Sequence, residues 1–169
     1  AESKYDYEGR AAVSILPAPV RSEDLHYRPL FNRFDDGQNA IAFEKNVWDT
    51  LGTCSSNAMQ PLSENHGAGK YYSQNNDILD DLYRDFIPDA DGYVYTQTQF
   101  TLDATGRVAR GSGVGDSLAL GACHEGRMFY GNTNQVELHR LFGSNVGNAT
   151  HYQKYMSVDA NGQVSITYA

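Results

Sequence analysis

Three adjacent residues, Cys123, His124 and Glu125, are side-chain types that a thiol hydrolase combines. A cysteine nucleophile needs a base such as histidine within hydrogen-bond reach. Neighbours on an extended segment point to opposite faces, so Cys123 and His124 cannot form that pair with each other. The base would have to come from a histidine elsewhere in the chain, namely His66, His139 or His151. No sequence spacing requires this, so we predict no catalytic residue and interpret His124 as a turn residue.

The segment Asp89-Ala90-Asp91-Gly92 is similar to the beginning of a calcium-binding loop. It lacks the third acidic position and the terminal bidentate Glu of an EF-hand. Asp89 and Asp91 are therefore calcium candidates only, and a turn capped by Asp side chains is the alternative. The glycine-rich run Gly111 to Gly115 is followed by Asp rather than Lys, which argues against a phosphate loop. We predict no metal and no cofactor.

The chain has two cysteines, Cys54 and Cys123, and neither lies in a C-x-x-C spacing. Thiolate binding of a metal is not indicated. In a secreted protein the two could form a disulfide across a long loop, which would stabilise the fold by about 4 kcal/mol through the unfolded state. Two buried free thiols are the alternative.

Composition excludes some classes of partner. The chain of 169 residues has a formal net charge of -8, and its thirteen Lys and Arg residues are scattered. Nucleic acids and anionic membranes attract clustered positive charge, so neither is a predicted partner. No apolar run approaches the roughly 18 residues needed to span a bilayer. The length fits a single domain, residues 1–169.

The elements that would position any site are β-hairpins with one recurring signature. Aromatic residues precede an Asp, two variable residues, a Gly and then Arg or Gln, and a short strand follows. Asp can bond its own backbone two residues on, and Gly can adopt a positive φ, so each copy predicts a turn between antiparallel strands. The turn residues of the copies are Asp6, Gly9 and Arg10; Asp103, Gly106 and Arg107; and Asp159, Gly162 and Gln163.

These stretches resemble the secreted RHS/YD-repeat proteins, which include shell components of Tc-type insecticidal toxins and, most similar here, giant proteins of Bacteroidetes. The matching segments are 5–20, 71–76, 87–107, 113–121, 124–131 and 137–169. The resemblance implies hairpins wound edge to edge into a curved sheet or part of a β-shell that can enclose an effector. The self-cleaving aspartyl site of many members has no match. The final strand, 164–169, lacks a turn of its own, which indicates a piece of a larger protein.

Around the hairpins we expect a variable insert at about 33–68 and two short helices. The helix at about 77–86 has an apolar stripe that ends at Phe86, and the helix at about 134–142 has Asn134 as its cap. Its buried stripe is Leu138, Leu141 and Phe142.

Between these elements we expect a strand at Leu25 to Phe31 with Leu25, Tyr27 and Phe31 facing inward. Trp48 is the predicted core anchor of the insert. The segment Cys54 to Gly69 is rich in Ser, Asn, Gly and Pro and is expected to be a surface loop.

The sequence thus predicts a mainly β, non-enzymatic module of a larger secreted or surface-associated, toxin-like protein. Its partners would be the remaining parts of the parent protein or copies of itself, joined through sheet edges. The alternative is a binding module in which exposed aromatic residues and the loop at 54–69 recognise a glycan or a protein.

Overall fold

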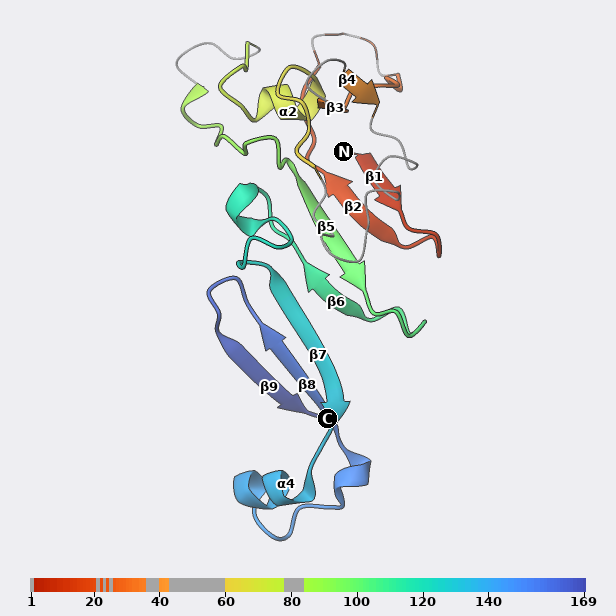
Figure 1. Ribbon diagram of the computed structural model, residues 1–169, viewed down its shortest axis with the longest axis vertical. Helices are drawn as coiled ribbons and strands as arrows, with labels where there is room; N and C mark the ends of the chain where they lie inside the picture. Colours follow the sequence, from red (N-terminus) through yellow and green to blue (C-terminus); the bar gives the residue numbers. More distant parts are fainter. Residues whose placement is uncertain are drawn as a thin grey trace.

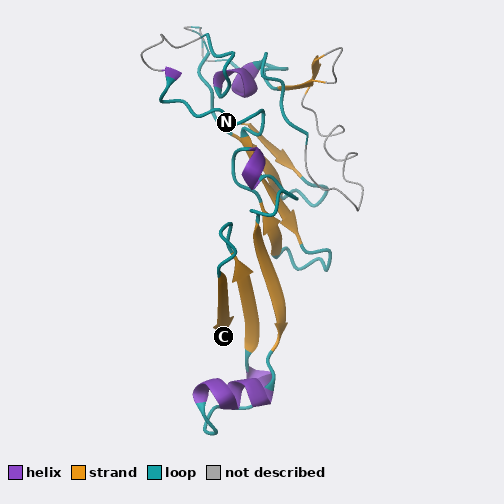
Figure 2. Ribbon diagram, turned by 60° about the vertical axis from the view of Figure 1, so that its left-hand side comes forward, coloured by secondary structure: helices purple, strands orange, loops and turns teal. Residues whose placement is uncertain are grey.

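The computed structural model describes residues 2–20, 22, 24, 26–35, 40–42, 60–77 and 84–169. The molecule is elongated, and one long twisted sheet runs along it with helical segments near its two ends (Figures 1 and 2). The predicted fold class, mainly antiparallel β with two short helices, is confirmed for these residues. None of the helices described is long and apolar enough to cross a membrane.

The main sheet has seven strands, and every neighbouring pair is antiparallel. In spatial order its strands are β1 (Glu2–Tyr5), β2 (Ala11–Ile15), β5 (Tyr95–Phe100), β6 (Val108–Gly111), β7 (Gly126–Asn132), β8 (Gln153–Val158) and β9 (Val164–Tyr168). The order follows the chain, so the sheet is a meander interrupted by one long insert between β2 and β5.

The remaining elements lie in the insert and in the connections. They are β3 (Arg33–Asp35) paired with β4 (Ala40–Ala42), α2 (Gly67–Tyr71), α4 (Gln135–Phe142), and the 3-10 turns η1 (Asp116–Leu118) and η2 (Ala149–His151). The insert forms the upper end of the molecule in Figure 1, and α4 forms the lower end.

Each copy of the D-x-x-G signature forms the turn of a hairpin. The turn that begins at Asp6 and the turn that begins at Asp159 share one geometry. In each, the Asp carboxylate accepts two backbone N–H groups, and the Asp N–H donates to the carbonyl four residues on. The glycine has a φ of 80° at Gly9 and 77° at Gly162, a conformation that favours glycine.

The copy at Asp103 differs because its loop is wider. The ladder closes at Thr101, whose N–H donates to the carbonyl of Arg107 at 2.8 Å. Asp103 then lies inside the loop, where it accepts bonds from Thr101, Thr105 and Arg107. Leu102 at the tip is fully exposed.

The hydrophobic core lies at the upper end, where the insert packs on β2 and the start of β5. Its buried members are Val13, Ile15, Phe34, Leu62, Ala68, Ala90, Val94 and Tyr95. The Asn32 side chain is also buried there and accepts the Ala68 N–H at 3.0 Å. The lower sheet has no comparable core.

The expected surface loop at 54–69 is wrong for the part that the structure describes, residues 60–69. Leu62, Ser63 and Gly69 are buried, and α2 begins at Gly67. Small residues serve close packing here: a Cβ added at Gly67 would lie 2.3 Å from the Phe31 carbonyl oxygen, and one at Gly69 would lie 2.3 Å from that of Ser63. Composition typical of a loop therefore marked tight packing instead.

Other expectations are also corrected. Residues 26–31 form no strand, and Tyr27 is 80% exposed because no layer covers that segment. Phe86, expected in a buried helical stripe, is 78% exposed. Residues 78–83 of that helix, together with Leu25, Trp48 and Cys54, lie outside the described residues.

The helix predicted at about 134–142 is present as α4. The Asn134 side chain caps it by accepting the Val136 N–H at 2.8 Å, and Gly143 ends it with a φ of 87°. Leu138 is fully buried. Leu141 and Phe142 are 56% and 58% exposed, so only one member of the expected stripe is buried, because a single layer of three strands offers little surface to cover them.

Candidate functional site

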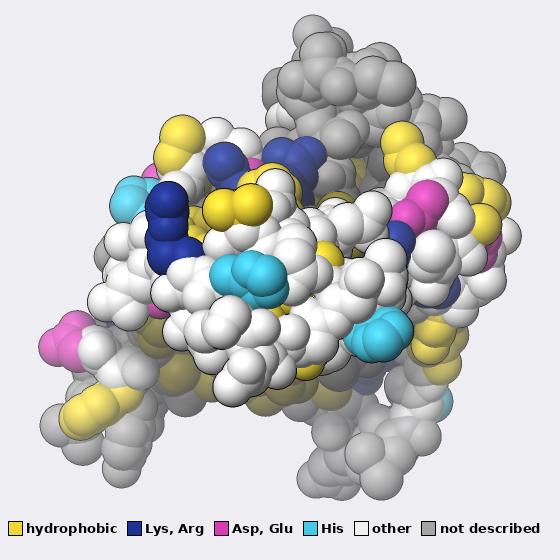
Figure 3. Space-filling view, turned by 90° about the horizontal axis from the view of Figure 1, so that it is seen from below, with side chains coloured by type: hydrophobic (Ala, Val, Ile, Leu, Met, Phe, Trp, Pro, Cys, Tyr) yellow, Lys and Arg dark blue, Asp and Glu magenta, His cyan; other side chains and the backbone are white. Residues whose placement is uncertain are grey.

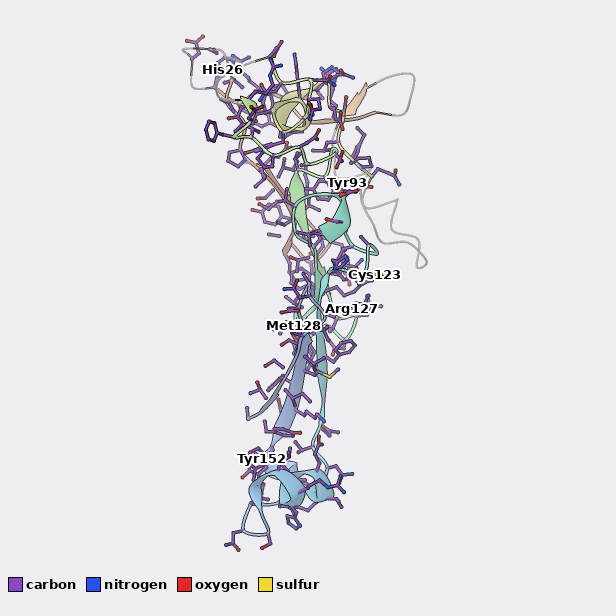
Figure 4. All side chains as sticks on the ribbon, turned by 90° about the vertical axis from the view of Figure 1, so that its left-hand side faces the viewer. His26, Tyr93, Cys123, Arg127, Met128 and Tyr152 are labelled. Carbon is purple, nitrogen blue, oxygen red and sulfur yellow. The ribbon has the colours of Figure 1, made fainter. Side chains whose placement is uncertain are left out.

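The residue types that suggested thiol chemistry do not form a catalytic group. Cys123 is exposed and has a φ of 71°. The neighbouring His124 uses its Nδ1 to contact the Ala160 carbonyl at 2.9 Å, which ties this turn to the turn after β8. Figure 4 shows Cys123 near the middle of the molecule, far from His26 at the upper end.

Two of the other histidines contact separate partners. His66 Nδ1 lies 3.3 Å from the Ser63 hydroxyl, and His139 Nε2 lies 2.9 Å from the Gln135 amide. At the α4 end, histidine, basic and apolar side chains are interspersed and form no single patch (Figure 3). The predicted disulfide stays a prediction, because Cys54 lies outside the described residues.

A third carboxylate, that of Glu64, lies beside the two calcium candidates Asp89 and Asp91. Oxygens of Glu64, Asp89 and Asp91 lie within 4.8 Å of one another, the only such group of potential ligands among the residues described. Burial, and then the charges of the two Asp residues, raise the pKa of Glu64. Asp89 also accepts the Asp91 N–H at 3.0 Å, as expected for a turn capped by an Asp side chain. Counting one oxygen from each residue, the group offers three ligand atoms, whereas calcium takes six to eight.

A buried acid links the upper and lower halves of the main sheet. Glu125 is 2% exposed, and its carboxylate accepts bonds from Arg110 at 3.2 Å, from Arg127 at 3.0 Å and from the Gly121 N–H. Burial acts to raise the pKa of Glu125, but these donors outweigh it and leave the pKa below its usual value. The Arg110 guanidinium also donates to the Gln99 side chain. All these groups have protein partners, which indicates a structural ion cluster.

An open hollow of about 540 Å³ lies on the sheet beside this cluster. It is lined by the glycines Gly111 and Gly126 and by apolar side chains that include Met128 and Val158. The nearby Asp159 carboxylate is occupied by the N–H groups of its own turn. The lining also includes the polar residues Arg127, Ser157, Gln163 and Ser165, of which Arg127 is bonded to Glu125.

The most distinctive surface is the lower sheet, β7 to β9. The register places Phe129, Met156 and Ile166 side by side, with Val158 and Val164 on the same face. Phe129, Ile166 and Val164 are 47%, 45% and 58% exposed. Figure 2 shows this part as a single layer. We call the face formed by Phe129, Met156, Val158, Val164 and Ile166 the apolar face.

The two outer strands of the sheet differ. On β1, the charged residues Glu2 and Lys4 are joined at 2.6 Å, Glu2 also accepts a bond from Asn32, and the ladder is irregular next to Lys4. On β9 there is no charged residue, and its ladder with β8 is regular. Charges, irregular pairing and side-chain cover are features that prevent strands from adding to an edge. The β9 edge lacks all three among the described residues.

The sequence showed part of this arrangement. The turn residues lie where they were predicted, at the ends of three hairpins. Glu64 was missed because Asp89 and Asp91 come from a distant segment. Glu125 was considered only beside Cys123 and His124, and its bond to Arg110 on β6 was not foreseen. The final strand at 164–169 was predicted, but the exposure of Val164 and Ile166 was not.

Comparison of the chain with protein-family models, with curated proteins and with solved structures finds no match.

Proposed function

We propose that this chain is a non-enzymatic structural module that contributes sheet to the shell or scaffold of a larger secreted or cell-surface protein of the RHS/YD-repeat, toxin-like kind. The observation that supports this most is the seven-stranded antiparallel sheet, in which β1 and β9 are the two edges. A sheet of this kind can be extended at either end by strands of the same type.

The construction of the hairpins also supports a structural role. The polar groups of the three turns bond mainly to one another, as in the pairs Asp6–Arg10 and Asp103–Arg107, which are both 2.6 Å long. The buried Glu125 likewise has donors from its own chain. Polar side chains that bond to the backbone or form ion pairs stabilise the hairpins, and few of them are left to act on a substrate.

Under this proposal the partners are the remaining parts of the parent protein, or other copies of the chain, joined through sheet edges. Neither nucleic acid nor a membrane is a proposed partner, given the net charge of -8.

Exposed tyrosines favour the second candidate function, recognition of a glycan or a protein. Tyr5, Tyr7 and Tyr27 are 53%, 74% and 80% exposed, and exposed tyrosine is common in binding surfaces. The part of the 54–69 loop that the structure describes packs into the core, so this segment offers less free surface than expected. A glycan array separates the candidates: binding lost in Tyr7→Ala and Tyr27→Ala would favour recognition.

Sedimentation of the purified chain over a wide concentration range tests the structural proposal, together with amide hydrogen exchange. We expect reversible association, with backbone amides of β1 or β9 exchanging more slowly at high concentration. A chain that stays monomeric, with edge amides that exchange rapidly at every concentration, would contradict it.

A further inference from the structure

The hydrogen-bond pattern of the last hairpin fixes which backbone groups of β9 face outward. Gln153 and Ala169 exchange both backbone bonds, at 2.7 and 3.0 Å, and the Asp159 N–H donates to the Gln163 carbonyl at 3.0 Å. In an antiparallel ladder, bonded and non-bonded pairs alternate. Gln163, Ser165, Thr167 and Ala169 therefore bond to β8, and the N–H and C=O groups of Val164, Ile166 and Tyr168 point away from the sheet.

The side chains of these outward-bonding residues lie on the apolar face or beside it. Ile166 lies opposite Met156, which lies opposite Phe129. Tyr168 lies two residues further along β9 on the same side of the sheet, opposite Lys154, and its ring centroid is 5.6 Å from that of Phe142 on α4. A strand that bonded to Val164, Ile166 and Tyr168 would therefore also extend the apolar face.

The chemistry of β9 fits a second copy of itself. If two β9 strands pair antiparallel around a two-fold axis at Ile166, then Ile166 faces its own copy and Val164 faces Tyr168 of the other chain. All outward donors and acceptors then meet partners, and no charges oppose each other because β9 has none. The segment 126–169 has three positive and two negative side chains, Arg127, Arg140 and Lys154 against Glu137 and Asp159, so the chain's acidic excess lies elsewhere.

The other edge is a poorer partner for β9. The ion pair of Glu2 and Lys4, the irregular pairing beside Lys4 and the bond from Asn32 all hinder addition of a strand to β1. A symmetric contact between identical edges is also the commonest form of homodimer.

We propose that β9 is a self-complementary docking edge through which two copies of this chain form an antiparallel, two-fold sheet centred on Ile166. This inference rests on the proposed structural function, since it names one of the edges and its partner. It predicts a closed dimer, with the insert ends of the two copies pointing away from the shared strands.

Proline at position 166 is the first test. Ile166→Pro removes only an outward N–H, and proline is tolerated on edge strands whose N–H faces solvent. We expect circular dichroism to show that the variant stays folded. We expect sedimentation to show that its dimer dissociation constant rises by about tenfold or more. Thr167→Pro removes an inward N–H instead and is expected to unfold the last hairpin.

Crosslinking tests the register without relying on proline. In a background with Cys54→Ser and Cys123→Ser, Ile166→Cys places two thiols face to face on the axis, within disulfide range. Thr167→Cys is the matched control, because its two copies would lie about 8 Å apart, too far to bridge. We expect a covalent dimer under oxidising conditions from the first variant only.

The outcomes separate this inference from the function on which it rests. Association of the unmodified chain without selective crosslinking at position 166 would overturn the β9 dimer and leave the structural role standing. A chain that is monomeric at all concentrations would overturn both.

Discussion

The Arg110 guanidinium on β6 lies 3.2 Å from the buried carboxylate of Glu125, in the loop that leads to β7. This contact joins the half of the sheet that shares the core with the half that does not.

Replacing that acid should destabilise the protein. Glu125→Gln keeps the shape but loses the charge-assisted bonds to Arg110 and Arg127, at a cost of about 2 kcal/mol at neutral pH. The pKa of Glu125 is lower in the folded protein than in the unfolded chain. Its ionised carboxylate therefore stabilises the fold at pH values above the unfolded-state pKa, and this stabilisation is lost as pH falls through the folded-state pKa. Urea unfolding at neutral pH and at low pH should show the two proteins converging in acid. Asp24→Asn is the control, because it removes one negative charge from an exposed side chain. It should leave the free energy of unfolding unchanged.

The acidic group at Glu64 should have the opposite pH dependence. Burial and the charges of Asp89 and Asp91 raise the pKa of Glu64 in the folded protein. Its ionisation therefore begins to destabilise the fold as pH rises above the unfolded-state pKa, and the full effect is reached above the folded-state pKa. Glu64→Gln should be more stable than the unmodified chain at neutral pH, by about 0.5 kcal/mol, and equal to it in acid. Thermal unfolding across pH is the measurement. A variant that is less stable at neutral pH would show that the carboxylate has a favourable partner.

Glycine substitutions should rank by geometry. Gly9→Ala meets no atom within 4 Å, but its φ of 80° costs about 1 kcal/mol. Gly67→Ala combines a φ of 54° with a Cβ 2.3 Å from the Phe31 carbonyl oxygen, and should cost about 3 kcal/mol or more. Gly131→Ala, on β7 with neither constraint, should be neutral or slightly stabilising. Denaturant midpoints of the three variants test the order, and equal effects would refute it.

The helix α4 should depend on one side chain. Leu138→Ala removes a fully buried leucine and should cost about 3 kcal/mol. Leu141→Ala removes the same atoms from a side chain that is 56% exposed and should change the stability by less than about 1 kcal/mol. Thermal melts of both variants provide the comparison. Similar losses would mean that Leu141 is covered in solution, as it would be by a partner chain.

Local signals predicted the hairpin turns and the elements at the lower end of the molecule well. The turns at Asp6 and Asp159, the cap at Asn134 and the strand at Val164 depend on residues close in sequence, so their chemistry is visible in a single chain. The wider loop at Asp103 was not foreseen, because the D-x-x-G pattern is compatible with the tight turn and with the wider loop.

The upper part was predicted poorly because its contacts join distant segments. Small residues at 60–69 suggested a surface loop, yet they pack against backbone at Phe31 and Ser63. Tyr27 and Phe86 suggested buried positions and are exposed. A pattern of polarity shows that a side chain can be buried, and only the fold decides whether another layer is there to cover it.

The joint between β6 and β7 has a mechanical consequence. Only Arg110 with Arg127 and Gly111 with Gly126 are in register there, whereas β7 and β8 pair along their full length from Arg127 to Asn132. Bending or pulling on the elongated molecule would concentrate strain at this short seam. Glu125 and the bond from the Tyr130 hydroxyl to the Val108 carbonyl brace it on either side. The seam is where we expect the sheet to flex, and where it would rupture first under load.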